Sequence, residues 1–241
     1  IGKLKSLVVG RYRLKFGMGL VINNDYSFGK LATLQTLGRS TNSIREHSSR
    51  SEANYMQGTA ATVSISKGLD ITGVISYRDI DATPNKDALS TIATITGNGY
   101  HRTVSEMARK HNTSIFAGGG NIRYFNNGFH IGMSAIYSSL NRELRPDTAR
   151  IYKRWSAYGK RFWNAGVDYG YICGKFSFNG ETATGDSHAV ATINSLSYKL
   201  LGNLQIMALQ RFYAYRYYGM YANSFSDAGS IQDESGIYLG I

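Results

Sequence analysis

From Val8 to Phe16, apolar and charged residues alternate with a period of two. One set is Val8, Gly10, Tyr12, Leu14 and Phe16, and the other is Val9, Arg11, Arg13 and Lys15. Successive side chains of a β-strand point to opposite faces of the sheet, so this alternation predicts a strand with an apolar and a cationic face. The surrounding stretch Leu7–Asn24 exceeds the roughly 5–6 residues usual in soluble proteins and reaches the roughly 9–11 residues of a bilayer-crossing strand.

Similar alternation returns in pairs of segments that are joined by turn sequences. Tyr55–Ser66 and Leu69–Ile80 flank Lys67-Gly68, where glycine allows the positive φ of a tight hairpin turn. A second predicted hairpin joins Thr113–Phe125 to Phe129–Leu140 through an Asn-Asn-Gly turn. Further strands are expected at Ala88–Thr96, Gly166–Ile172, Lys175–Thr184, His188–Leu200, Leu204–Tyr221 and Gly236–Ile241.

Two longer segments, Leu31–Asn54 and Asn141–Trp155, are polar and lack a clear period, so we expect loops or segments that fill a lumen. Thr103–His111 differs from both, because Thr103 and Glu106 have the spacing of a helix capping box. This spacing predicts one short helix within a loop.

The fold class that this pattern indicates is all-β, specifically an antiparallel transmembrane β-barrel of the outer-membrane type, of which this chain is a part. Short turns alternate with long loops, as in outer-membrane barrels. Tyrosines are expected at the strand ends, where their rings would lie at the membrane–water interface. They are Tyr12, Tyr26, Tyr137, Tyr152, Tyr158, Tyr198 and those between Tyr213 and Tyr221. A soluble β-sandwich also alternates and stays open as the alternative.

In a barrel, each cation of the first strand that faced lipid at mid-bilayer would cost about 2–4 kcal/mol. Three such cations would approach the whole stability of a domain, about 5–15 kcal/mol. We therefore expect Arg11, Arg13 and Lys15 to face the lumen, and the Tyr12/Leu14/Phe16 face to lie against lipid.

The composition is compatible with this fold. The chain has 241 residues, 42% of them hydrophobic, and no run of apolar residues long enough for a membrane-spanning helix. The mean hydropathy of −0.27 does not exclude a barrel, because only alternate residues of its strands face lipid. We expect one domain over residues 1–241, as a fragment or a mature piece of a longer protein. Cys173 has no partner for a disulfide or a metal site and is expected to be a small packing residue.

The net charge of +11 favours polyanionic partners such as nucleic acid or phosphorylated lipid head groups, and cations scattered over loops are the alternative. Basic stretches contain Arg39, Arg45, Arg50 and the range 142–154. Proteins that bind single-stranded nucleic acid interleave cations with aromatic rings. Such interleaving is weak here, although Tyr152, Trp155 and Tyr158 lie in or just after the second basic stretch. Lipid A phosphates of lipopolysaccharide are an equally good partner for cations at a rim.

His101, Arg102, Thr103 and Glu106 form the densest polar group of the sequence. They are either a polar site in a loop or lumen or, as we favour, a capping box with a solvated arginine. The five histidines lack metal-ligand spacing, and no hydrolase or metalloprotease motif is present. We therefore expect no enzyme activity, metal or cofactor. Gly118-Gly119-Gly120 lies in a predicted strand and is expected to allow a bend or close packing.

Charged residues inside predicted strands suggest a second group, because a charge in a membrane strand should face the lumen and find a partner. Glu181, Arg211, Arg216 and Glu234 could form a lumenal Arg/Glu ladder that ties the strands to an internal plug. Exposure at loop level is the alternative.

Several strings, in the same order along the chain, resemble a family of Bacteroidetes outer-membrane proteins with helix-hairpin-helix (ComEA-like) domains. Gly10–Asn24 followed by Phe28–Lys30 resembles the start of that family's barrel region. The other strings are Gly99–Arg109 (family G-hydrophobe-H-R-T-x-x-E), Phe178–Ala183 (F-G-E-x-A), Gln210–Phe225 (Y-R-x-Y-x-x-x-Y-x-x-x-Y-A-N-x-F) and Asp233–Leu239 (N-E-x-G-x-Y-x-G). Asn179 interrupts the third string, and Asp233 replaces the asparagine of the last.

The resemblance implies an outer-membrane β-barrel, located in a Gram-negative outer membrane, with further strands beyond residue 241. The family's helix-hairpin-helix region is absent from this chain, so the resemblance implies fold and location more than activity.

Two functions follow as hypotheses. The first is a pore, transport or uptake component with a cationic lumen. The second is a structural or scaffold barrel in an outer-membrane complex, whose loops bind partner proteins.

Overall fold

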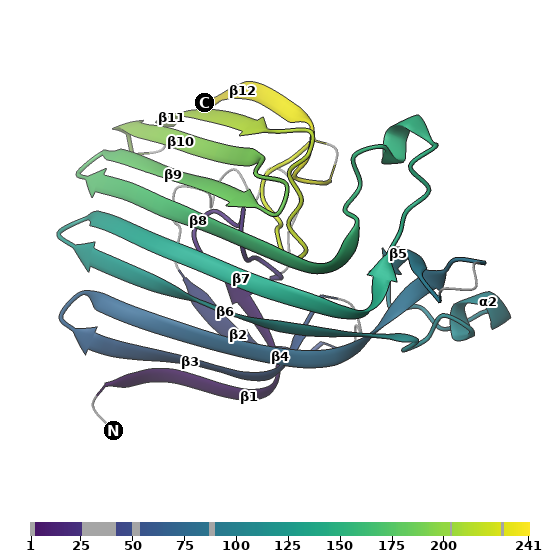
Figure 1. The fold of residues 1–241 in the computed structure, drawn as a ribbon. Coiled ribbons are helices and arrows are strands. Elements are labelled where there is room, and N and C mark those ends of the chain that lie inside the picture. The colour runs from purple at the N-terminus through teal and green to yellow at the C-terminus, as the bar shows by residue number, and fades with distance from the viewer. Residues whose placement is uncertain (1–2, 26–41, 50–53, 87–89, 203, 228) are drawn as a thin grey trace.

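The computed structural model describes residues 3–25, 42–49, 54–86, 90–202, 204–227 and 229–241. They fold into one twelve-stranded sheet that is almost entirely antiparallel (Figure 1). The strands are β1 (Leu4–Lys15), β2 (Ser43–Glu46), β3 (Met56–Ser66), β4 (Leu69–Pro84), β5 (Ile92–Thr96), β6 (Thr113–Asn126), β7 (Phe129–Leu144), β8 (Gly159–Cys173), β9 (Phe176–Gly185), β10 (Val190–Leu201), β11 (Leu204–Tyr213) and β12 (Glu234–Gly240). The predicted all-β class is confirmed, and Tyr26, Arg39 and Arg50 lie outside the described residues.

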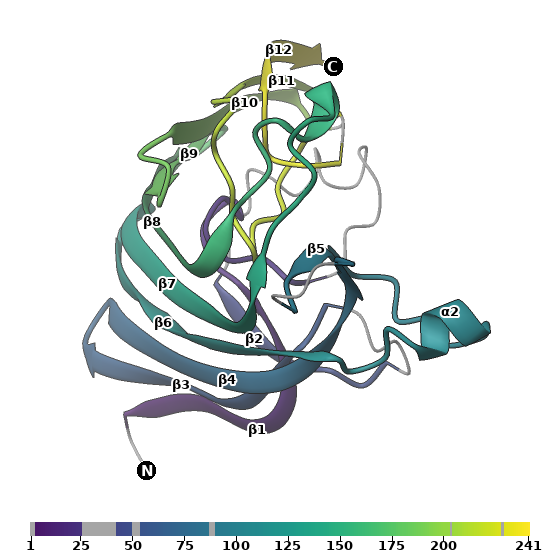
Figure 2. The same cartoon turned by 45° about the vertical axis from the view of Figure 1, so that its right-hand side comes forward.

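The long strands β1, β3, β4 and β6 to β12 follow one another as antiparallel neighbours and curve into a trough (Figures 1 and 2). Both predicted hairpins are confirmed, with their turns at Lys67-Gly68 and Asn127-Gly128. Tight turns join the strands at one end of the sheet, which we call the turn end. The other end, called here the loop end, carries the longer connections, including residues 85–112, 145–158 and 214–233.

Four of the strands close into a small mixed ring. β4 pairs with β5 and β6, β6 pairs with β7, and β5 completes the circuit through one parallel bridge between Ile92 and Leu144. The remaining eight strands extend outward from this ring, and the sheet ends at β12 and β2. The larger sheet therefore does not close on itself within the described part of the chain.

The two faces of the sheet differ in polarity, as β7 illustrates. Phe129, Ile131 and Met133 on its convex face are 42–57% exposed. Alternating with them on the concave face, His130 and Ser134 are nearly fully buried. The sheet thus carries large apolar side chains outside, whereas its inward face combines polar residues with buried apolar ones such as Ile136, Ile193 and Leu209.

Apolar residues from two other segments fill the concave side. The first segment leaves β1, whose last residues turn inward and pair with β2, and the second follows β11. The buried cluster joins them with the inward residues of the wall, and its largest members include Tyr12, Leu14, Phe16, Leu20, Tyr213 and Tyr217. Our expectation that the Tyr12/Leu14/Phe16 face lies against lipid was wrong, because this part of β1 bends into the interior.

The structure corrects three further expectations. β11 ends at Tyr213 instead of continuing to Tyr221, because an irregular segment follows in which the Tyr217 hydroxyl donates to the Leu20 carbonyl (2.7 Å). Tyr12, Tyr213 and Tyr217 are buried and do not lie at exposed strand ends. Cys173 is exposed rather than packed.

The predicted short helix is confirmed as α2 (Val104–Met107) with the expected capping box. No helix in the described ranges has both the length and the apolar character needed to span a membrane.

Two adjacent glycines of β6 provide a matched test of the strand packing. A Cβ on Gly119 would lie 2.3 Å from the Ala135 carbonyl oxygen, whereas on Gly118 the nearest atom belongs to the Phe116 ring at 3.4 Å. Gly119→Ala should therefore lower the free energy of unfolding by about 1–3 kcal/mol through overpacking. Gly118→Ala should change it by less than about 0.5 kcal/mol, as at an open surface site. Thermal unfolding followed by circular dichroism measures both, and equal losses would contradict the close approach.

Candidate functional site

On the concave side, one buried carboxylate binds the turn that follows β1. Glu181 is on the inward face of β9 and is 1% exposed. Its Oε2 accepts hydrogen bonds from the backbone N–H groups of Met18 (2.6 Å) and Leu20 (3.1 Å), and its Oε1 accepts one from Val21 (3.2 Å). One side chain thereby satisfies three donors of an irregular segment that would otherwise be buried without partners. We call this arrangement the Glu181 clamp.

Gly17 allows the turn to approach so closely. Its φ is +55°, and a Cβ there would lie 2.8 Å from Glu181 Oε2 and 3.0 Å from the Cβ of Asp168. A side chain at this position would be strained and would also collide with both acidic residues.

Further polar residues surround the clamp on the inward faces of β6 to β8. Asp168 is 2% exposed, and its Oδ2 lies 3.7 Å from Nε2 of His130. Asn121 and Ser134 are hydrogen-bonded to each other (2.9 Å) on the same side of the wall. This group combines two carboxylates, an imidazole and an amide on one face of the wall.

The predicted Arg/Glu ladder is only partly brought together. Arg211 Nε lies 2.5 Å from Glu234 Oε1, and Arg211 also pairs with Asp227. Glu181 is not part of this pair, because its partners are the backbone N–H groups of the turn. Arg216 lies beyond the end of β11, where it is exposed. Sequence reasoning missed the backbone partners, for which the closely spaced Gly17 and Gly19 were the available signal.

The three cations of β1 that were predicted to face a lumen lie in different environments. The Arg11 guanidinium is exposed and lies 4.7 Å from the ring centroid of Tyr55. Arg13 is buried, with its Nη1 3.4 Å from Asp25 Oδ1. Lys15 is half-buried. Their role in a lumen stays a prediction.

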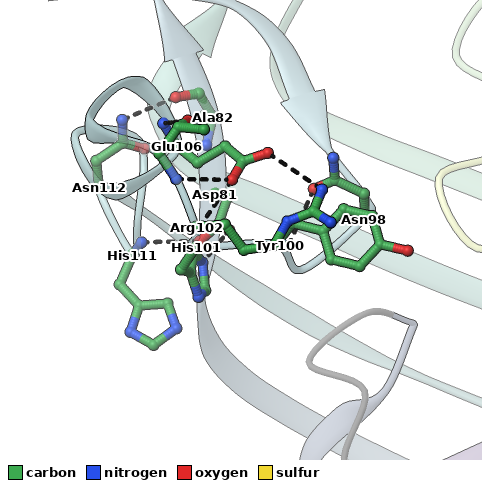
Figure 3. Close-up of polar contacts among 10 residues, drawn as sticks. Asp81, Ala82, Asn98, Tyr100, His101, Arg102, Glu106, His111 and Asn112 are labelled. Atoms are coloured by element: carbon green, nitrogen blue, oxygen red, sulfur yellow. Dashed lines mark hydrogen bonds and ion pairs between the residues drawn. The ribbon is translucent and has the colours of Figure 1, made fainter.

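The polar loop cluster predicted around His101 is anchored to the end of β4 (Figure 3). His101 Nε2 lies 2.6 Å from Asp81 Oδ2, and the backbone N–H of His111 donates to Asp81 Oδ1 (2.9 Å). The Asn112 side chain bonds both the N–H (3.1 Å) and the C=O (2.8 Å) of Ala82. These contacts tie both ends of the 101–111 excursion to one strand.

Within that excursion, the capping box forms as the sequence predicts. Glu106 Oε2 accepts from the N–H groups of Arg102 (2.8 Å) and Thr103 (3.1 Å), and Thr103 Oγ1 accepts from the Glu106 N–H (3.2 Å). The hydrogen bond from the Arg102 N–H is the main reason why the pKa of Glu106 lies below its usual value. His101, Arg102, Thr103 and Glu106 therefore serve to build this loop.

Two polar cavities open on the concave side. One, of about 370 Å³, is lined by residues that include Lys5, Asp70, Asn121 and Arg123. The other, of about 350 Å³, lies between Tyr55, Arg78, Tyr221 and their neighbours. No group of three or more metal-ligating side chains occurs in the described part of the chain.

Comparison of the chain with models of known protein families and with curated protein sequences gave no match.

The clamp leads to a stability prediction. Glu181→Gln replaces a carboxylate oxygen by an N–H donor that faces backbone donors, so the free energy of unfolding should fall by about 1–3 kcal/mol. Thermal unfolding measures the loss. Glu46→Gln, which makes the same chemical change at an exposed position of β2, is the control and should have little effect. An unchanged melting temperature for Glu181→Gln would show that the turn is held by other contacts.

A second prediction concerns the loop anchor. Asp81→Ala removes the acceptor of both His101 and the His111 N–H, so residues 97–112 should open more often. A loss of about 1–3 kcal/mol of local stability would raise amide hydrogen exchange there by about 5- to 150-fold. Asp79→Ala, at an exposed position of the same strand, should leave the exchange rates unchanged. Equal exchange in both variants would rule out Asp81 as the anchor.

Proposed function

We propose that the chain is part of an outer-membrane β-barrel protein of Gram-negative bacteria that acts as a structural scaffold, binding partner proteins in a membrane complex. We further propose that it belongs to the Bacteroidetes family that its sequence resembles. The observation that carries the proposal is the convex face of the wall, which exposes many large apolar side chains.

A soluble antiparallel sheet places an apolar face on a core and a polar face in water, whereas this wall is apolar on its exposed convex face as well. Val9, Ile75 and Met133 are 57–74% exposed on the convex side, and many neighbours on the same face are also apolar. Water-soluble monomers rarely expose apolar patches larger than a few hundred Å². Lipid is a solvent in which such a face is stable.

Aromatic residues near the strand ends add support. Phe129 and Tyr137 lie eight positions apart on the convex face of β7. Eight residues of a strand span about 27 Å, and a tilted strand of that length covers most of an apolar band about 25 Å tall. Tyr171, level with Phe129 on β8, and Trp163, level with Tyr137, repeat the arrangement. Such rings are typical of the two membrane interfaces.

The evidence for a scaffold role is a group of polar side chains on the otherwise apolar convex face, across β9 to β11. Asn194 accepts a hydrogen bond from the Tyr169 hydroxyl and donates to Gln210 (both 2.8 Å), and Thr182 is hydrogen-bonded to Thr192 (3.1 Å). Polar side chains at membrane depth require partners, and they commonly mediate contacts between membrane proteins. A partner protein beside these strands would meet both needs.

A pore or uptake component is the second candidate, favoured by the polar cavities on the concave side. Against it, the apolar cluster from the segments after β1 and β11 occupies much of that side. Conductance of the purified protein in planar bilayers distinguishes the two candidates. Steady channel currents would favour the pore, whereas their absence, together with recovery of partner proteins from detergent-solubilised membranes, would favour the scaffold.

The membrane proposal itself predicts the effect of a charge on the convex face. Met133→Arg would place a cation in the middle of the apolar face and should lower stability by about 2–4 kcal/mol in lipid vesicles. Val104→Arg is the matched control, because Val104 is 89% exposed on α2, away from the wall. The gel migration of boiled and unboiled samples reports the folded fraction. If Met133→Arg instead changes stability by less than about 0.5 kcal/mol, as at an ordinary soluble surface, the membrane proposal fails.

A further inference from the structure

Two connections at the loop end come together around Trp155. The first is residues 145–158, which contain the short 3₁₀ helix η1 (Ile151–Lys153), and the second follows β11. The rings of Trp155 and Tyr215 lie 4.7 Å apart between centroids. The Gln232 side chain fixes this contact by donating to the carbonyls of Trp155 (2.8 Å) and Tyr215 (2.7 Å).

Two arginines are held over the indole ring. The Arg216 guanidinium carbon lies 4.6 Å from the Trp155 ring centroid, and that of Arg154 lies 5.4 Å from it. Both side chains are exposed, and among the described residues neither forms a salt bridge. A stacked guanidinium keeps the N–H groups at its edge available, because they point along its own plane and not into the ring below. The indole thus fixes two cations while leaving their donors directed to solvent.

The cations border a cavity of about 290 Å³, lined by residues that include Arg154, Arg216, Ser156, Ser187 and Asp186. It is larger than a phosphate ion requires and lies near the lower size limit of small-molecule sites, roughly 300 Å³. Serine hydroxyls can donate and accept hydrogen bonds, and the Asp186 carboxylate can accept them from sugar hydroxyls beside the bond that it already takes from the Trp163 N–H (2.9 Å).

The arrangement selects among anionic ligands. The indole itself is covered by two guanidiniums and the Tyr215 ring. Tyr158 also lines the cavity and is 53% exposed, so a sugar ring could lie against it beside the two cations. Guanidinium forks match phosphate oxygens bidentately. We propose that Arg154 and Arg216, positioned by Trp155, form a binding site for a phosphorylated saccharide, either free or as the head group of a glycolipid.

The test uses the full chain in detergent micelles with Trp163→Phe, which leaves Trp155 as the remaining one of two tryptophans. Trp155 fluorescence is titrated with glucosamine 1-phosphate in one arm and with lipid A in mixed micelles in the other. Unphosphorylated glucosamine is the ligand control. A saturable change with either phosphorylated ligand, and none with glucosamine, is expected. If only lipid A binds, the natural ligand is a glycolipid head group. If glucosamine 1-phosphate also binds, free sugar phosphates are ligands as well.

Substitutions distinguish recognition of phosphate by the planar guanidinium groups from attraction by positive charge alone. Arg154→Gln with Arg216→Gln should weaken binding about tenfold or more, through the loss of charge-assisted hydrogen bonds. Arg216→Lys keeps the charge but loses the planar fork and should also weaken binding, which covers the case that the double variant misfolds. Arg161→Gln, which removes an exposed cation from β8, is the matched control and should bind normally.

The proposal is overturned if neither phosphorylated ligand saturates the signal, if glucosamine binds as tightly, or if Arg161→Gln weakens binding as much as the double variant. The soluble arm does not depend on a membrane location. Failure of this site and failure of the membrane proposal, which Met133→Arg tests, are therefore distinguishable.

Discussion

The interior of this protein depends on the hydrogen bonds between one carboxylate and the backbone of a distant turn. Residues 17–21 leave β1 and enter the concave side without strand partners, where unsatisfied N–H groups would be costly. Glu181, some 160 positions away in the sequence, accepts three of these bonds. Once the turn is fixed, Leu20 can accept from the Tyr217 hydroxyl, and the segment after β11 packs against it. The two interior segments are thus joined through the clamp.

The concave side is filled, whereas the convex face is both apolar and uncovered. The inward residues of the wall either pack against the interior segments as apolar side chains, such as Ile193 and Leu209, or are hydrogen-bonded, as Asn121 and Ser134 are. The convex side also carries large apolar side chains, such as Ile75 and Met133. A soluble protein would need a second layer over that face, and none of the described segments covers it (Figures 1 and 2). The proposed lipid environment meets this need without a second layer.

Local patterns in the sequence were sufficient for most of the wall, because alternation and turn glycines act between neighbouring residues. They missed β2, which lies in an expected loop, and residues 159–165 of β8. Both hairpins and the Thr103–Glu106 capping box were predicted from such patterns. Alternation shows which residues share a face but not which face is covered, so Tyr12 and Leu14 were assigned to the wrong side. The partners of Glu181 were also missed, because backbone N–H groups carry no residue-specific signal and only the glycines at 17 and 19 marked the turn that supplies them. Arg211 and Glu234 were both named in the predicted ladder, because charges in a strand context need partners, and they do form an ion pair.

The side chains that hold loops in place by hydrogen bonds indicate at which end of the sheet a ligand or partner protein can bind. Connections at the turn end are too short to carry a site, as Lys67-Gly68 and Asn127-Gly128 illustrate. At the loop end, by contrast, Asp81 anchors one long connection and Gln232 joins two others. Binding loops need such anchoring, because a site that must first be ordered loses affinity. The loop end therefore combines exposure with preorganisation, and a ligand or partner protein that binds there would act on a surface already held in place by the wall and its interior segments.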